Sequence, residues 1–528
     1  MATLEAPVRP RSSLHSGPFV TEPFFDFRNE ENARRMRAAI AKVRGQLGRE
    51  YDLIIGGKRV KTTDKIKSLN PSKPSEIVGL HQKAGKEHVE PAMTAALKAF
   101  ASWSRTSVEE RAGLLFRVGD NMRQRKMEYM AWLVFEVSKN WAEADADISE
   151  TIDFCEFYAR ESRRLAGPQP IVTSDGSDVA MTYQPLGVGV AISPWNFPCA
   201  IATGMTVGPV VAGNCVLFKP ASLTPIVAAR MVEILEEAGL PPGVVNFVPG
   251  SGEEVGDFVV EHPEVRFVSF TGSREVGTRI YERAARVQPG QRWLKRVVAE
   301  MGGKDAIVVD DSWCDLEAAA SGIVVSAYGF QGQKCSACSR MIAVGGTHDR
   351  LVELVVEGAR ALRIGSPRDP TVNFGPLASA DQLRKVQSYV ELGEGRPALM
   401  PGNVDLPGYF YPPTVIDDVP SSARIAQEEI FGPVLSVLRA RDYDEAIAIA
   451  NSTPYGLTGS VYALDRTKLE RAKRDFQVGN LYLNRKCTGA RVGVEPFGGF
   501  GMSGTNAKAG GPDYLKWFVD AKVSSELL

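Results

Sequence analysis

The chain is predicted to fold as an α/β protein with two large domains, each built on a parallel β-sheet. Its 528 residues are too many for one hydrophobic core, because a domain usually holds about 100–200 residues. Apolar residues make up 44% and charged residues 24%, as in an ordinary globular protein. Short apolar segments alternate with helical ones along the chain, which is typical of parallel strands joined by right-handed crossovers.

The first elements are expected to be a helix, a hairpin and a helical region. Residues Asn29 to Leu47 show a charged amphipathic pattern. Tyr51 to Val60 is typical of a hairpin whose Gly56-Gly57 turn requires positive φ. From Lys86 to Gly167 the apolar residues recur with the helical period.

The centre of the chain carries the clearest strand–helix alternation. The strands expected there are Gly187–Ile192, Cys215–Phe218, Val244–Val248 and Val265–Phe270. One intervening helix is well marked, with Thr224 as its N-cap, Pro225 at its first position and Gly239 beyond its end.

A second alternation begins near Asp305 and continues to strands at Ser460–Ala463 and Asn480–Asn484. We therefore place the join between the two sheets near Glu300–Lys304.

Composition excludes several classes of function. A net charge of −1 gives no electrostatic attraction to nucleic acid, and we expect none to bind. Seven cysteines in a long chain indicate reduced thiols in a cytoplasmic protein, and five histidines without metal-ligand spacing indicate no metal site. The uncharged stretch Met181–Phe218 contains four prolines and two asparagines, so we expect no membrane association.

Cys335 begins a CxxC pattern that has three interpretations. A zinc half-site would need a second pair of ligands, and a redox dithiol would need the start of a helix. The third is a single nucleophile in a glycine-containing turn, where Lys334 and backbone N–H groups would favour the thiolate. Glu300 ends an apolar run, and burial there would raise its pKa and suit it to act as a base.

Two kinds of glycine-rich segment bear on cofactor binding. Gly499 to Gly504 matches GxGxxG but lacks a strand before it and a helix after it, so we expect a loop. Gly252 and Gly272-Ser273 each follow a predicted strand, and a phosphate could bind at the N–H groups there.

Taken in order, several motifs resemble those of the aldehyde dehydrogenase superfamily, and the resemblance runs from about residue 50 onward. The motifs are Pro194–Pro198, Phe218–Ala221, Phe270–Ser273, Glu300–Lys304, Gly332–Cys335 and Glu428–Pro433. The resemblance implies two Rossmann-type parallel-sheet domains plus a small β flap used in oligomerisation. The implied division is an N-terminal helical extension at 1–50, a cofactor-binding domain at 51–167 and 186–299, a catalytic domain at 300–504, and a flap at 168–185 and 505–528.

The resemblance also implies roles for single residues. Cys335 matches the nucleophile, Asn196 the oxyanion donor, and Glu300 the base that activates water. The positions that match cofactor contacts are Ile192, Ser193, Pro194, Trp195, Lys219, Ser222, Gly252, Gly272, Ser273, Glu429 and Phe431. The implied cofactor is NAD. Many NAD-preferring relatives have Glu where this chain has Ser222, so we also expect some use of NADP.

The segments Val324–Ser336 and Ser503–Tyr514 resemble the branch of the superfamily that oxidises L-glutamate γ-semialdehyde to glutamate in proline catabolism. The matching substrate contacts are Ser336, Gly489, Ala490, Phe197, Phe497 and Lys334. The alternatives are oxidation of another semialdehyde, such as succinate semialdehyde, and a non-catalytic binding protein of the same fold. The expected partners are the small-molecule substrate, further copies of this chain in a dimer or larger assembly, and a proline dehydrogenase that would be a separate protein.

Overall fold

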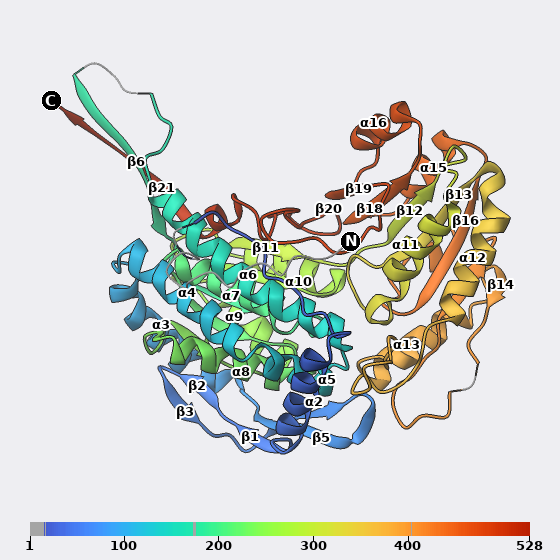
Figure 1. The fold of residues 1–528 in the computed structure, drawn as a ribbon. Coiled ribbons are helices and arrows are strands. Elements are labelled where there is room, and N and C mark those ends of the chain that lie inside the picture. Colours follow the sequence, from blue (N-terminus) through green and yellow to red (C-terminus); the bar gives the residue numbers. More distant parts are fainter. Residues whose placement is uncertain (1–14, 16, 173–175, 403) are drawn as a thin grey trace.

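The computed structural model describes residues 15, 17–172, 176–402 and 404–528. The remaining residues, 1–14, 16, 173–175 and 403, lie outside this description, and they include parts of the predicted N-terminal extension and flap. The predicted N-terminal helix is present as α2 (Glu30–Arg44), which packs beside α5 (Lys126–Glu136) (Figure 1).

The first large sheet has seven strands in the order β11-β10-β7-β8-β9-β2-β3, and the five from β11 to β9 are parallel. Their bounds are β2 (Leu53–Ile55), β3 (Lys58–Val60), β7 (Val188–Ile192), β8 (Cys215–Lys219), β9 (Val245–Phe247), β10 (Val265–Thr271) and β11 (Arg296–Glu300). The associated helices are α3 (Val89–Trp103), α4 (Val108–Gln124), α5 (Lys126–Glu136), α6 (Trp141–Ala166), α7 (Ala200–Val211), α8 (Pro225–Glu237), α9 (Asp257–Glu261) and α10 (Arg274–Ala285). A three-stranded sheet, β1-β5-β4, lies at Arg49–Tyr51, Lys73–Gln82 and Lys65–Asn70.

The second large sheet has the order β14-β15-β16-β13-β12-β18-β19, and only β14 is antiparallel to its neighbour. Its strands are β12 (Asp305–Val309), β13 (Cys338–Val344), β14 (Arg396–Leu399), β15 (Thr414–Asp417), β16 (Val434–Ala440), β18 (Thr458–Tyr462) and β19 (Asn480–Leu483). The helices of this half are α11 (Leu316–Tyr328), α12 (His348–Arg360), α13 (Ala380–Val390), α14 (Arg424–Gln427), α15 (Tyr443–Ala450) and α16 (Arg466–Asp475).

Both faces of this second sheet are covered. In β12, Ile307 and Val309 enter one hydrophobic cluster while Ala306 and Val308 enter another. A strand buried on both faces appears in the sequence as a continuous apolar run, and the residues after Asp305 in β12 form such a run. The predicted α/β class with two parallel sheets is confirmed.

A two-stranded antiparallel ribbon projects from the body of the molecule (Figure 1). It consists of β6 (Ser177–Pro185) and β21 (Val519–Leu527), paired from Val519–Pro185 to Leu527–Ser177. Every residue of β21 after Val519 is exposed in the single chain. Within the described residues, no helix combines the length and the apolar character needed to cross a membrane.

The predicted cap of α8 is wrong in one respect. Thr224 precedes the helix, but its buried hydroxyl has no hydrogen-bond partner in the part of the chain that the structure describes. The N–H groups of Ile226 and Val227 instead donate to the Glu136 carboxylate, at 2.8 and 2.6 Å. Glu136 ends α5 and also accepts from the Ser68 hydroxyl at 2.7 Å. A carboxylate from a distant helix therefore satisfies the donors at the start of α8.

We expect Glu136→Ala to lower the free energy of unfolding by about 3 kcal/mol, because it leaves buried donors without a partner. Thr224→Val is the matched control and should be neutral or slightly stabilising, since it removes an unpartnered buried hydroxyl. Urea unfolding of the two variants checks this. A loss of about 1 kcal/mol in Thr224→Val, with no loss in Glu136→Ala, would restore Thr224 as the cap.

Candidate active site

Cys335 lies in a tight turn between α11 and β13. The backbone just before it is unusual, because Phe330 and Gln331 have positive φ (51° and 55°). Gly332 follows at φ 68°, and a Cβ there would lie 2.4 Å from the Gly432 carbonyl oxygen. Only glycine fits such a position, so this turn holds Cys335 close to the segment around Phe431.

The electrostatic surroundings of Cys335 differ from those predicted. Burial raises the pKa of the Cys335 thiol, and the carboxylates of Asp305, Glu429 and Glu300 raise it further. The expectation that Lys334 would favour the thiolate is therefore wrong for this structure. Lys334 is itself buried, its own pKa is lowered, and its strongest charged neighbour is Glu143. The thiol must accordingly lose its proton in a site that disfavours negative charge.

Glu300 ends β11, and the predicted rise in its pKa is confirmed. Burial raises the pKa of Glu300 to about 8, while the Ala507 N–H, the Lys508 charge and the Gly499 N–H oppose that rise. One carboxylate oxygen accepts from the Ala507 N–H at 3.3 Å, and the other is buried with no partner in the described chain. A carboxyl group with this pKa can gain and lose a proton near neutral pH.

Asn196 is buried next to the nucleophile's turn. Its side-chain amide donates to the Gln333 carbonyl at 3.0 Å, two residues before Cys335. The amide is therefore anchored by one N–H to the strained turn.

A cavity of about 1130 Å³ brings the predicted reaction and substrate residues together. Its lining includes Cys335, Glu300, Ser336, Lys334, Gly489, Ala490, Phe197 and Phe497. Asn196 does not itself line the cavity, although its neighbour Phe197 does.

The predicted cofactor residues gather at a different place, the carboxyl edge of the first sheet. Ile192 pairs with Lys219 and with Phe270, and Thr271 pairs with Glu300, so the ends of β7, β8, β10 and β11 are level. Gly272 and Ser273 follow β10, and Ser273 caps α10 through the Val276 N–H at 3.3 Å. Ligands of open parallel sheets bind at this edge.

The side chains along this edge leave polar groups available. Lys219 is buried, donates only to the Pro220 carbonyl (3.3 Å) among the described residues, and burial lowers its pKa to about 8. The Ser193 hydroxyl is buried and has no hydrogen-bond partner among the described residues, whereas Ser222 is exposed. Gly252 starts the short helical segment Gly252–Gly256 after β9, with Ser251 as its cap.

Two residues from the second half of the chain reach the same edge. Phe431 has a backbone φ of 60°, and its ring contacts the Trp195 ring edge-on with the two ring centroids 5.4 Å apart. Pro194, the residue before Trp195, is half-buried. Glu429 accepts from the Gly303 N–H at 3.0 Å. A Cβ at Gly302 would lie 2.3 Å from the Glu429 carboxylate, so any other residue there would force this carboxylate to move.

Several acidic residues of this cavity were not predicted. Glu143, Glu150 and Asp153, all on α6, line it. Burial raises the pKa of Glu150 to about 8 and of Asp153 to about 7, and it also raises that of Glu143. Asn140 and Glu143 form a recognisable capping box, which marks the start of a helix but not what its face contacts. The N-terminal residues Thr21–Phe24 also line the cavity and were not predicted to do so.

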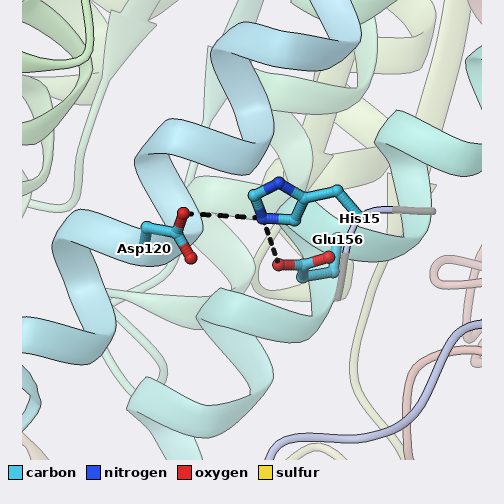
Figure 2. A group of neighbouring side chains, drawn as sticks. All are labelled: His15, Asp120 and Glu156. Atoms are coloured by element: carbon cyan, nitrogen blue, oxygen red, sulfur yellow. Dashed lines mark ion pairs between the residues drawn. The ribbon is translucent and has the colours of Figure 1, made fainter. Parts of the chain in front are cut away.

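The histidine cluster formed by His15, Asp120 and Glu156 lies outside this site (Figure 2). His15 Nε2 is 3.5 Å from Asp120 of α4 and 3.8 Å from Glu156 of α6, and its ring stacks on Phe116. Glu156 also pairs with Arg123 at 2.8 Å and Arg160 at 2.6 Å. We interpret the cluster as a structural contact that fastens the N-terminal segment to these two helices.

Comparison with known proteins agrees with this geometry. The model of the aldehyde dehydrogenase family matches residues 59–524. A 1-pyrroline-5-carboxylate dehydrogenase from Geobacillus thermodenitrificans is 56% identical, covering 97% of this chain and 99% of the relative. The crystal structure of a 1-pyrroline-5-carboxylate dehydrogenase from Thermus with bound NAD superposes with a TM-score of 0.95, at 54% identity over 97% of this chain and 99% of the other. The chain therefore belongs to the aldehyde dehydrogenase family.

Proposed function

We propose that this chain oxidises L-glutamate γ-semialdehyde, the hydrolysed form of 1-pyrroline-5-carboxylate, to L-glutamate with NAD. The observation that carries the proposal is that Cys335 and Glu300 open on the same cavity as Ser336, Gly489 and Ala490. The names of the close relatives support the same substrate.

The first step is attack of the Cys335 sulfur on the aldehyde carbon, which forms a thiohemiacetal. The thiol loses its proton and the carbonyl oxygen gains negative charge. The Asn196 amide has one N–H bound to Gln333, which leaves a second N–H for that oxygen. The Cys335 backbone N–H is the second donor, and a preorganised donor of this kind contributes about 3–4 kcal/mol.

A later step is hydrolysis of the thioester on Cys335, which forms when the thiohemiacetal carbon loses a hydride. Glu300 takes a proton from water, the water oxygen attacks the acyl carbon, and the carbon–sulfur bond breaks to release the carboxylic acid while the proton from Glu300 passes to the leaving sulfur and restores the thiol. Because its pKa is about 8, Glu300 is mostly protonated at pH 7 and becomes a better base as pH rises.

The residues at the sheet edge fit a dinucleotide. When bound, NAD supplies the acceptor for the hydride that the thiohemiacetal carbon loses. Within the described ranges of the chain the buried Ser193 hydroxyl has no hydrogen-bond partner, and Lys219 is buried beside the loop that contains Ser222. We assign Lys219 and Ser222 to the adenosine ribose, Gly252, Gly272 and Ser273 to the adenine and pyrophosphate, and Ile192–Trp195, Glu429 and Phe431 to the nicotinamide end.

The substrate head is a zwitterion, and the cavity offers opposite charges to its two groups. Ser336 with the N–H groups of Gly489 and Ala490 would bind the carboxylate, near Lys334 and Lys486. The acidic side chains Glu143, Glu150 and Asp153 of α6 line the same cavity, and a bound ammonium group would favour their ionised form. Phe197 and Phe497 would contact the aliphatic chain.

NADH formation with 1-pyrroline-5-carboxylate, compared with succinate semialdehyde and propanal, tests the substrate. We expect the highest kcat/KM for 1-pyrroline-5-carboxylate. A preference for either simple aldehyde would replace the substrate assignment, and no turnover with any aldehyde would favour a binding protein. Protection of Cys335 from thiol labelling by NAD or substrate would then separate these two cases.

We predict measurable turnover with NADP at saturating concentration. The exposed Ser222 neither accepts strongly from a ribose 2′-hydroxyl nor repels a 2′-phosphate. Ser222→Glu should lower kcat/KM for NADP by at least about tenfold and leave that for NAD within a few-fold, because like charges in contact cost several kcal/mol. If the wild-type protein shows no turnover with saturating NADP, the predicted use of NADP is excluded.

Members of this family typically form oligomers, and we propose a homo-oligomer of this chain. The exposed strand β21 supports this, because a two-stranded ribbon is only marginally stable alone. We also propose the division into cofactor-binding, catalytic and flap regions, a proline dehydrogenase partner that is a separate protein, and a cytoplasmic location. All seven cysteines are free thiols, which supports the last of these.

A further inference from the structure

The loop from Phe497 to Gly511 forms one wall around Glu300. Phe497 and Ala509 exchange two backbone hydrogen bonds, at 2.9 and 2.8 Å. The loop is joined to the end of β11 by Thr505 N–H to Ala299 O and Met301 N–H to Ser503 O, both 2.8 Å. Its position is therefore fixed relative to Glu300.

The Lys508 side chain connects this loop to the residues around it by hydrogen bonds. Its ammonium group donates to the Gly479 carbonyl at 2.7 Å, the Gly498 carbonyl at 3.0 Å and the Asn480 side-chain oxygen at 3.3 Å. Its backbone φ is 55°, a conformation that costs energy for a residue other than glycine. Asn506, two residues earlier, has φ 53°. The three bonds of the ammonium group keep Lys508 in this strained conformation.

The Gly498–Gly499 peptide connects Lys508 with Glu300. The carbonyl of this peptide accepts from the Lys508 ammonium at 3.0 Å, and its N–H lies near enough to the Glu300 carboxylate to lower the pKa of that group. A cation at the carbonyl end and an anion at the N–H end polarise one peptide group in the same direction, which strengthens its interactions with both charges. The second donor to Glu300, the Ala507 N–H, belongs to the residue directly before Lys508.

We propose that Lys508 is a positioning residue that orients both backbone donors toward Glu300 and, by its charge, keeps this carboxyl group ionisable near neutral pH. Lys508 touches neither the substrate nor the cofactor site described above. The inference rests on the proposed role of Glu300 in thioester hydrolysis.

The groups facing Glu300 set the direction of the effect. Burial is the largest influence on Glu300, and the two N–H groups and the Lys508 charge all act against it. The Glu300 charge in turn acts on Lys508, whose pKa burial lowers. Loss of the cation removes one opposing influence directly and weakens the alignment of the N–H donors, so the pKa of Glu300 should rise further.

The test is the pH profile of kcat in Lys508→Met, Lys508→Arg and the control Lys516→Met. Lys516 lies on the same C-terminal segment, is exposed and pairs with Asp513 at 2.6 Å, so its loss removes an equal charge away from Glu300. On the acid side of the profile, kcat rises as Glu300 loses its proton. In Lys508→Met this acid limb should move up by about one pH unit, so kcat at pH 7 falls about tenfold and recovers above pH 9. KM for the aldehyde should stay within about twofold, and Lys508→Arg and Lys516→Met should keep the wild-type limb.

Hydrolysis of a chromogenic ester is measured in parallel, because it requires Cys335 and Glu300 but neither the proposed substrate nor NAD. If the acid limb of ester hydrolysis shifts in Lys508→Met but no aldehyde is oxidised, the proposed role of Lys508 stands and the proposed substrate is refuted. A kcat lowered equally at every pH would reduce Lys508 to a structural role and overturn the proposal. If Lys508→Met does not fold, the test uses Lys508→Arg, which retains the positive charge. A displacement of its acid limb by more than about half a pH unit would contradict the proposal.

Discussion

Cys335→Ala is expected to lower kcat/KM by about 10⁴-fold or more, because removal of a covalent nucleophile leaves only binding and electrostatic stabilisation of the transition state. NAD binding should persist, since the cofactor residues lie at the sheet edge rather than in the nucleophile's turn. Steady-state NADH formation and an NADH titration of the same sample measure the two properties separately.

Cys338→Ala is the matched control, three residues along the chain. Cys338 begins β13 and is buried, and it does not line the cavity. We expect activity within a few-fold of wild type. If Cys335→Ala kept turnover within about tenfold of wild type, or if Cys338→Ala lost it to the same degree, the single-nucleophile interpretation would fail.

Glu300→Gln is expected to lower steady-state turnover by about 10²–10⁴-fold, the usual contribution of a general base. The amide has nearly the same shape and can still accept from the Ala507 N–H, but it cannot take a proton from water. The thioester on Cys335 should therefore accumulate after one turnover. Mixing at pH 9, where more thiolate is present, should give a burst of one NADH per active site.

Intact-protein mass spectrometry after the burst provides the second readout, as an acyl adduct that maps to Cys335. The acid limb near pH 8 should also disappear, because glutamine does not titrate in that range. A variant with no burst and no adduct would move Glu300 to a step before thioester formation. A variant with wild-type turnover would remove it from the mechanism.

Local patterns in the sequence were sufficient for the elements that carry the site. The apolar runs that became β7, β8, β10 and β12 alternate with helices over short distances. The apolar residues before Glu300 likewise indicated its burial and raised pKa, because a strand buries a whole run of neighbours.

Contacts between distant parts of the chain could not be predicted in this way. Glu136 accepts from the Ile226 N–H of α8, 90 residues further along the chain, and no local signal connects the two. The charges that raise the pKa of Cys335 come from Asp305, Glu429 and Glu300, whereas the adjacent Lys334 faces Glu143. The acidic face of α6 shows only helical periodicity until the cavity beside it is known.

The central claim is the conversion of L-glutamate γ-semialdehyde to glutamate, and product stoichiometry tests it most directly. Purified protein is incubated with 1-pyrroline-5-carboxylate and NAD, and glutamate and NADH are quantified together. The proposed chemistry predicts equal amounts of the two products, both lost in Cys335→Ala. NADH formed without glutamate, or glutamate absent while simple aldehydes are oxidised, would contradict it.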